Sequence, residues 1–192
     1  MKDTKISLVL LTSALAVMTS GITMQSAHPA RPGGNNSSFK IYTNDLSGVR
    51  LQYPSDWTPS SIGLKDYTDI IAFYSPLQNI SDSFPTRLKI SLNRFSQVPT
   101  LADYTNHVLG QIKRANRTIV SNDANITLSG HPAHRVVWIE SPLTNSPFKF
   151  YGLKIWTIVG NNSYLITYEG EQSRFNQRFH EVSQIIDSLR IP

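Results

Sequence analysis

Hydrophobic and polar residues alternate with a period of two in several short segments of the chain, which predicts a domain rich in β-strands. Residues 39–43 and 49–53 alternate on either side of a polar segment, Asn44–Gly48, and together predict a β-hairpin. Pro54 ends the second strand because proline cannot donate a hydrogen bond to a sheet. Further strands are expected at residues 70–74, 87–92, 118–121, 125–129, 135–140, 148–159 and 163–169.

Two of these pairs are joined by turn-forming residues. The segments 118–121 and 125–129 flank Asn122-Asp123, which predicts two short strands about a turn. The segments 148–159 and 163–169 flank Gly160-Asn161-Asn162, which predicts a second hairpin.

Two segments instead repeat hydrophobic residues at helical spacing. The first follows Thr100, which can cap a helix together with Asp103 three residues later. Lys113 and Arg114 suit the C-terminal end of that helix. The second helix runs from about Glu171 to Leu189. The predicted buried stripes are Leu101, Tyr104, Val108, Leu109 and Ile112 in the first helix, and Phe175, Phe179, Val182, Ile185, Ile186 and Leu189 in the second.

The fold class follows from the strands that are hydrophobic on both faces. Residues 148–159 place Trp156 and Ile158 on one face and Leu153 and Ile155 on the other. Such strands must be covered on both sides. We therefore expect an α+β domain, a three-layer α/β/α sandwich with a largely antiparallel central sheet and helices on both faces.

The N-terminus has the pattern of an export signal. Lys2 and Lys5 precede an uncharged, largely apolar run, Ile6–Met24. As a helix this run of 19 residues would reach ~28 Å, close to the hydrocarbon thickness of a bilayer. Residues 1–27 are therefore interpreted either as a cleaved signal peptide or as an N-terminal membrane anchor that leaves the domain on the outer face.

Residues 28–38 contain Pro, Gly, Asn and Ser and nothing that could pack into a core, so they are expected to form a flexible tether. The folded domain is then residues 39–192. We expect an extracytoplasmic protein, either secreted or anchored to the outer face of the membrane.

The amino-acid composition excludes several kinds of functional site. The chain has no cysteine, which excludes disulfides, thiolate zinc sites, iron–sulfur clusters and cysteine nucleophiles. The chain carries 18 basic and 13 acidic residues; removing Lys2, Lys5 and Asp3 with residues 1–27 leaves 16 and 12, a net charge of +4. Basic and aromatic residues do not interleave on one predicted face, so nucleic-acid binding is not expected.

No catalytic or metal-binding group is assigned from the sequence. His131 and His134 point to opposite faces of an extended chain, while His107 and His180 are expected to face solvent. There is no Gly-x-Ser-x-Gly motif and no phosphate-binding glycine loop. Asp66 and Asp69, placed in one loop, supply too few oxygens for a Ca²⁺ site.

The sequence also contains candidate sites of N-glycosylation. Six Asn-x-Ser/Thr sequons occur in an exported chain, and most fall in predicted loops and turns, where glycosylation is favoured. The candidate acceptors are Asn35, Asn36, Asn79, Asn116, Asn125 and Asn161.

The order of motifs in residues 39–192 resembles that of the PsbP-like family, whose plant members are extrinsic lumenal subunits of photosystem II. The matching pieces are Tyr42, Gly48-Val49, residues 53–57, Phe73–Pro76, Leu101–Tyr104, residues 128–133, Trp156–Asn161, Tyr164–Tyr168, Phe175, Phe179 and Ser188. The resemblance implies a central antiparallel sheet between helices and an exported, non-enzymatic accessory role. It also implies, for some members, an affinity for calcium or manganese.

The expected function is therefore that of an exported, non-enzymatic accessory or binding protein of the cell envelope, whose partner is a membrane protein complex or a small ligand. Two alternatives stay open: a calcium- or manganese-handling module, and a hydrolase with a dispersed site. No cofactor is assigned.

Overall fold

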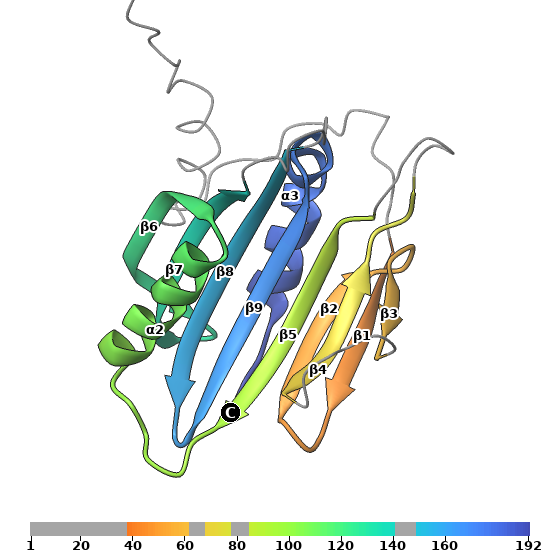
Figure 1. Cartoon of the computed structure of the whole chain (residues 1–192). Coiled ribbons are helices and arrows are strands. Elements are labelled where there is room, and N and C mark those ends of the chain that lie inside the picture. Colours follow the sequence, from red (N-terminus) through yellow and green to blue (C-terminus); the bar gives the residue numbers. More distant parts are fainter. Residues whose placement is uncertain (1–37, 62–67, 78–84, 141–148) are drawn as a thin grey trace, which may run out of the picture. The chain divides into compact units, whose positions relative to one another are not determined.

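The computed structural model describes residues 38–61, 68–77, 85–140 and 149–192. These residues form nine strands and two helices (Figure 1). The strands are β1 Phe39–Asn44, β2 Val49–Pro54, β3 Thr58–Ser60, β4 Asp69–Tyr74, β5 Arg87–Arg94, β6 Arg117–Leu128, β7 His131–Glu140, β8 Phe150–Val159 and β9 Asn162–Glu171. The helices are α2 Leu101–Arg114 and α3 Gln172–Ser188.

The strands form two antiparallel sheets. The larger has seven strands in the order β3-β4-β5-β9-β8-β7-β6, and the smaller is the β1–β2 hairpin. The central strands, β5, β9 and β8, pair in continuous register over their whole length. The hairpins predicted from residues 39–43 with 49–53 and from residues 148–159 with 163–169 are confirmed as β1–β2 and β8–β9. The expected, largely antiparallel sheet is also confirmed, since every strand pair described is antiparallel.

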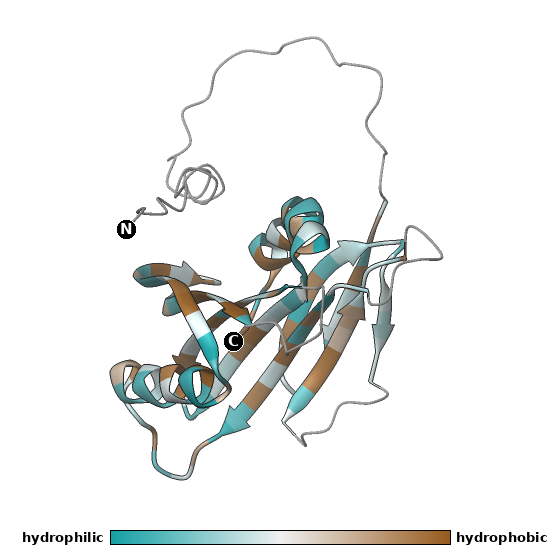
Figure 2. Ribbon diagram, turned by 45° about the horizontal axis from the view of Figure 1, so that its top comes forward, coloured by the Kyte–Doolittle hydropathy of each residue, from teal (hydrophilic) through white to brown (hydrophobic). Residues whose placement is uncertain are grey.

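The two helices lie on opposite faces of the large sheet (Figure 1). We call the face that carries α2 the α2 face and the other the α3 face. Hydrophobic and polar positions alternate along the strands of the large sheet, as the hydropathy colouring shows (Figure 2). The predicted three-layer α/β/α class is confirmed, because each helix packs its hydrophobic stripe on its own face.

The α3 face carries the larger core. Val182 and Ile185 of α3 are fully buried against residues of β5, β8 and β9 such as Ile90, Ile155 and Ile166. The β1–β2 hairpin joins the same core through Val49, Leu51 and Tyr53. Strand β2 ends at Pro54 and helix α3 begins only at Gln172, yet both share one hydrophobic cluster and together they cover this face.

The N-terminus of α2 is capped as the sequence predicts. The Thr100 hydroxyl accepts a hydrogen bond of 3.1 Å from the backbone N–H of Asp103, which satisfies one of the free donors of the first turn. All five residues of its predicted stripe pack in the α2-face cluster, with Val136, Trp138 and Trp156. Trp156 also donates a 2.9 Å hydrogen bond from Nε1 to Thr105 of α2.

The expectation of two short strands about Asn122-Asp123 was wrong. Residues 117–128 form one edge strand, β6, whose register against β7 shifts between Ile119 and Ser121 and again between Asp123 and Ile126. These irregularities accommodate the polar residues without a turn. Asn122 bonds to His134 of β7, and Asp123 forms an ion pair of 2.8 Å with Arg135.

Other boundaries also differ from the predictions. Strand β3 was not expected, β7 begins at His131 instead of Arg135, and Asp69 is the first residue of β4 rather than part of a loop. Strand β8 begins at Phe150, and Phe148 lies outside the described residues. Within the part of the chain that the structure describes, neither helix is long and apolar enough to span a bilayer.

Candidate functional site

The α2 face of the large sheet is covered unevenly. Helix α2 packs over residues of β7 and β8, among them Val136 and Trp156. Beside it, residues of β4, β5, β8, β9 and α2 border a cavity of about 690 Å³. This cavity has the size of a small-molecule site. Its lining combines charged and hydroxyl side chains with hydrophobic ones, including Phe95, Tyr104 and Leu165.

A row of three polar residues crosses the sheet under this cavity. Lys89 of β5 lies directly opposite Thr167 of β9, and Thr167 lies directly opposite Lys154 of β8. Residues that are direct partners across antiparallel strands share a face. With strands ~4.8 Å apart, the two lysine Cα atoms are separated by ~10 Å. All three residues line the cavity.

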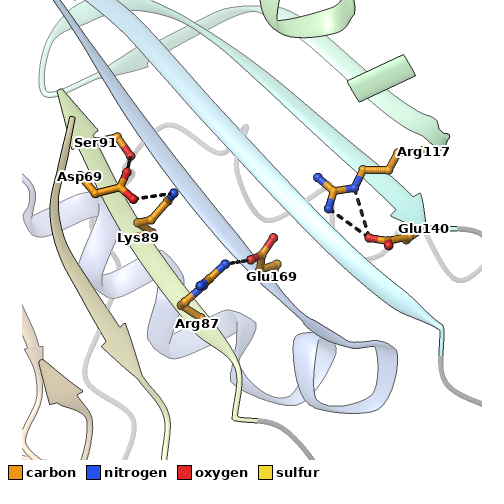
Figure 3. A network of polar contacts seen from close by, with 7 residues as sticks. All are labelled: Asp69, Arg87, Lys89, Ser91, Arg117, Glu140 and Glu169. Atoms are coloured by element: carbon orange, nitrogen blue, oxygen red, sulfur yellow. Dashed lines mark hydrogen bonds and ion pairs between the residues drawn. The ribbon is translucent and has the colours of Figure 1, made fainter. Parts of the chain in front are cut away.

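Ion pairs lie at the Lys89 end of this row and beside it; Figure 3 draws Lys89 and these pairs. Lys89 Nζ lies 3.0 Å from Asp69 Oδ2, and the Ser91 hydroxyl donates to the other carboxylate oxygen of Asp69. The Asp69 side chain is 3% exposed, so the salt bridge and the hydroxyl offset the cost of burying its charge. Arg87 of β5 pairs with Glu169 of β9.

Lys154 is different from its neighbours. Within residues 38–61, 68–77, 85–140 and 149–192, its ammonium group has neither an ion-pair partner nor a hydrogen-bond partner. Burial lowers the pKa of Lys154, and the positive charges of Arg117 and Lys89 act in the same direction against Glu169 and Asp69. A cation thus stands in the cavity without its own carboxylate.

A second cavity, of about 360 Å³, lies further along the same face and is lined by Arg87, Arg117 and Trp138 among others. The Arg117 guanidinium carbon is 3.9 Å from the centroid of the Trp138 ring, close enough for a cation–π interaction. Arg117 also pairs with Glu140 at 3.1 Å. The Trp138 ring lies over Gly152, its direct partner on β8, where a side chain would collide with it.

The glycosylation candidates fall in three kinds of place. Asn116 is exposed in the turn after α2 with a φ of 56°, and Asn161 is exposed in the turn between β8 and β9. Asn125 is exposed but lies within β6, not in a turn as expected. Asn35, Asn36 and Asn79 lie outside the described residues. The structure does not bring the three described candidates together.

The histidines do not assemble a reactive group in the described residues. His107 and His180 are exposed on their helices, as predicted, and His107 bonds to Gln111 at 3.0 Å. His134 is buried, bonds to Asn122 and stacks on Trp156 with ring centroids 4.9 Å apart. Burial lowers the pKa of His134, against the nearby charge of Asp123.

Metal-ligating side chains are dispersed in the same part of the chain. No three His, Asp or Glu residues among those described are grouped as metal ligands would be. Asp69 is occupied by Lys89 and Ser91, and Asp66 lies outside the described residues.

Sequence reasoning did not find the polar row. Lys89, Thr167 and Lys154 are far apart in the chain, and only strand order and register bring them together. One signal was available: Lys154 interrupts an otherwise hydrophobic strand, on the face assigned to Trp156 and Ile158. A charged residue in the middle of such a strand indicates a place where the cover of the sheet is incomplete.

Several solved structures share this fold. The solution structure of cyanobacterial PsbP from Synechocystis superposes with a TM-score of 0.58 at 11% identity, covering 85% of this chain and 98% of that one. LpqN of Mycobacterium tuberculosis is described as involved in cell envelope biogenesis. It superposes with a TM-score of 0.61 at 12% identity, covering 82% of this chain and 93% of LpqN. The Ran-binding protein Mog1p of Saccharomyces cerevisiae superposes with a TM-score of 0.57 at 7% identity, covering 81% of this chain and 96% of Mog1p.

At these identities the likeness is one of fold. No curated protein sequence matches the chain. The sequence profile of the PsbP-like proteins, however, matches residues 20–191 and so includes every strand and helix described above. The chain belongs to the PsbP-like protein family.

Proposed function

We propose that this chain is a non-enzymatic accessory protein of the cell envelope that binds its ligand or partner at the α2 face. The observation that carries the proposal is the uneven cover of the large sheet. The α3 face is covered by α3 and the β1–β2 hairpin, whereas the α2 face leaves polar side chains around a cavity of about 690 Å³. A sheet that exposes convergent polar groups beside an open cavity is a general form of binding site.

Two further observations support an envelope location. Lys2, Lys5 and the apolar run Ile6–Met24 have the pattern of an export signal. A protein of similar fold, LpqN, is described as involved in cell envelope biogenesis. We propose that the domain acts outside the cytoplasm, either free or held to the outer face of the membrane by residues 1–27.

The two alternative functions have less support. A calcium or manganese site would need free carboxylates, but Asp69 in the cavity is neutralised by Lys89. A hydrolase would need a serine or carboxylate within hydrogen-bond reach of a histidine. The cavity histidine, His107, bonds to Gln111 instead, and no described histidine is hydrogen-bonded to a serine or a carboxylate.

The proposal can be tested by capture from native membranes. The full chain carries a C-terminal affinity tag, is crosslinked in its own cells and is purified for mass spectrometry of its partners. Gln111 is exposed on α2 and lines the cavity, so Gln111→Trp should obstruct it. Asn106 is exposed on the same helix away from the cavity, and Asn106→Trp is the matched control.

We expect Gln111→Trp to lose the crosslinked partner or ligand that the unaltered chain and Asn106→Trp retain. Equal capture by all three proteins would refute binding at the α2 face. The mature N-terminus, read from the same preparation, separates a cleaved signal peptide from a retained anchor.

A further inference from the structure

The charges around the large cavity do not balance. The charged residues among its described lining are Lys89, Arg94 and Lys154 against Asp69 and Asp103. Both carboxylates are already engaged: Asp69 with Lys89 and Ser91, and Asp103 with the Thr100 hydroxyl at 2.6 Å. Among the described residues, Lys154 and Arg94 are therefore left without a carboxylate partner, and of the two only Lys154 is partly buried, whereas Arg94 is exposed.

Among the residues that the structure describes, no carboxylate near Lys154 is free to pair with it. Glu169, the acidic residue that acts on it most strongly, is paired with Arg87. Lys154 is partly buried, and a partly buried ammonium carries a desolvation cost unless an opposite charge accompanies it. In a core position such a lysine would be expected to have a carboxylate partner, whereas in a binding site the partner can come from the ligand.

The position of Thr167 gives the site a second donor. Thr167 lies directly across from Lys154 on β9, lines the same cavity and is mostly buried. Within the described residues, its hydroxyl makes no hydrogen bond with another side chain. An ammonium and a hydroxyl side by side on one sheet face can both donate to the oxygens of one anion.

We propose that the cavity on the α2 face binds an oxyanion, a phosphate or carboxylate group of the ligand, between the Lys154 ammonium and the Thr167 hydroxyl. This inference rests on the proposed binding function and names the chemistry of what is bound. Lys89, two strands away, is held by Asp69 and adds positive potential to the same row. Phe95, Tyr104 and Leu165, at the α2 end, provide hydrophobic contact for the rest of the ligand.

The bound anion would also change the titration of Lys154. In the free protein, burial lowers the pKa of this lysine. An anion in contact with the ammonium favours its charged form, so binding should raise that pKa. A lysine with a merely structural role would titrate at the same pH with and without the anion.

The test is titration calorimetry of the purified full chain with inorganic phosphate and with acetate, at constant ionic strength set by chloride. Lys154→Met removes the charge at similar volume, and Thr167→Val removes only the hydroxyl. Lys113→Met removes one positive charge from an exposed position of α2 that does not line the cavity. Vesicles of phosphatidylglycerol, compared with phosphatidylcholine, test whether the anion is a lipid headgroup.

We expect Lys154→Met to weaken binding by at least about tenfold and Thr167→Val by a smaller factor, with Lys113→Met unchanged. In the unaltered protein, the pKa of Lys154, followed through its side-chain NMR signals, should rise on saturation. A phosphate or acetate response indicates a soluble anion, and a phosphatidylglycerol response alone indicates a lipid; either supports the site if Lys154→Met abolishes it.

The inference is overturned if no probe binds, or if Lys154→Met and Lys113→Met respond alike. Near-UV circular dichroism checks that the variants are folded, and Thr167→Val keeps the test decisive should Lys154→Met misfold. If Gln111→Trp still loses its crosslinked partner while no anion binds, the α2 face remains a docking surface and only the oxyanion site is lost.

Discussion

Replacing Gly152 with alanine would put a methyl group into the space that the Trp138 ring occupies. The new Cβ would lie 1.9 Å from Cζ2 and 2.0 Å from Cε2 of that ring. Ordinary carbon contacts are ~3.5 Å or longer, so the ring would have to move by about 1.6 Å. Trp138 is 1% exposed and carries Arg117 over its ring, so there is little room for that movement.

The expected cost follows from these contacts. Overfilling a packed site typically costs about 1–3 kcal/mol. The change from glycine to alanine also stabilises the protein by about 0.4–1 kcal/mol, because it lowers the conformational entropy of the unfolded chain. We therefore expect Gly152→Ala to lower the free energy of unfolding by about 1–2 kcal/mol and to displace Arg117 from the second cavity.

Urea denaturation followed by tryptophan fluorescence and far-UV circular dichroism would measure this. Gly110→Ala in α2 is the matched control, because the same methyl group meets only the flexible end of Arg114, at 3.4 Å. Alanine is more favourable than glycine in a helix interior by about 0.8–1 kcal/mol, so Gly110→Ala should have a higher free energy of unfolding than the unaltered chain. If Gly152→Ala unfolds within 0.5 kcal/mol of the unaltered protein, the close packing of Trp138 on β8 is not as we describe it.

Two further predictions concern the helix cap and the unpaired lysine. Thr100→Ala removes the side-chain acceptor for the Asp103 N–H and should cost about 1 kcal/mol in urea denaturation, whereas Thr100→Ser should retain most of the stability; equal losses would exclude a capping role. Because burial lowers the folded-state pKa of Lys154, its charge destabilises the fold fully below that pKa and progressively less as the pH rises to its unfolded value near 10.5. Lys154→Met should therefore be more stable than the unaltered protein at neutral pH, with a difference that shrinks toward pH 10; a difference independent of pH would contradict this.

The elements that the sequence predicts well are those specified by local patterns. The cap at Thr100, the two hydrophobic helical stripes and the Gly160-Asn161-Asn162 turn each depend on neighbouring residues, and each is found where expected. The placement of helices on both faces also followed, because strands that are hydrophobic on both sides require two covers.

What escaped prediction depends on partners distant in the chain. Asn122-Asp123 reads locally as a turn, but its side chains are held by His134 and Arg135 of the next strand, which keeps β6 continuous. The packing of Trp138 on Gly152 and the alignment of Lys154 with Thr167 follow from strand register alone. The candidate site consists of such cross-strand contacts, which is why sequence patterns assigned it no residues.

The shared core of the β1–β2 hairpin and α3 has a consequence for the order of folding. Leu51, near the start of the domain, is buried in a cluster that includes Ile185 and Ile191, so this cluster is complete only after most of the domain has been synthesised. Contacts of such long sequence separation slow folding and leave hydrophobic strands exposed until late. In the export proposed above, the hairpin residues of the unfolded chain would cross the membrane before α3 does. The hairpin can meet Phe73 of β4 early, but it would lack its contacts with α3 until that helix emerged, so this core would be completed only on the far side.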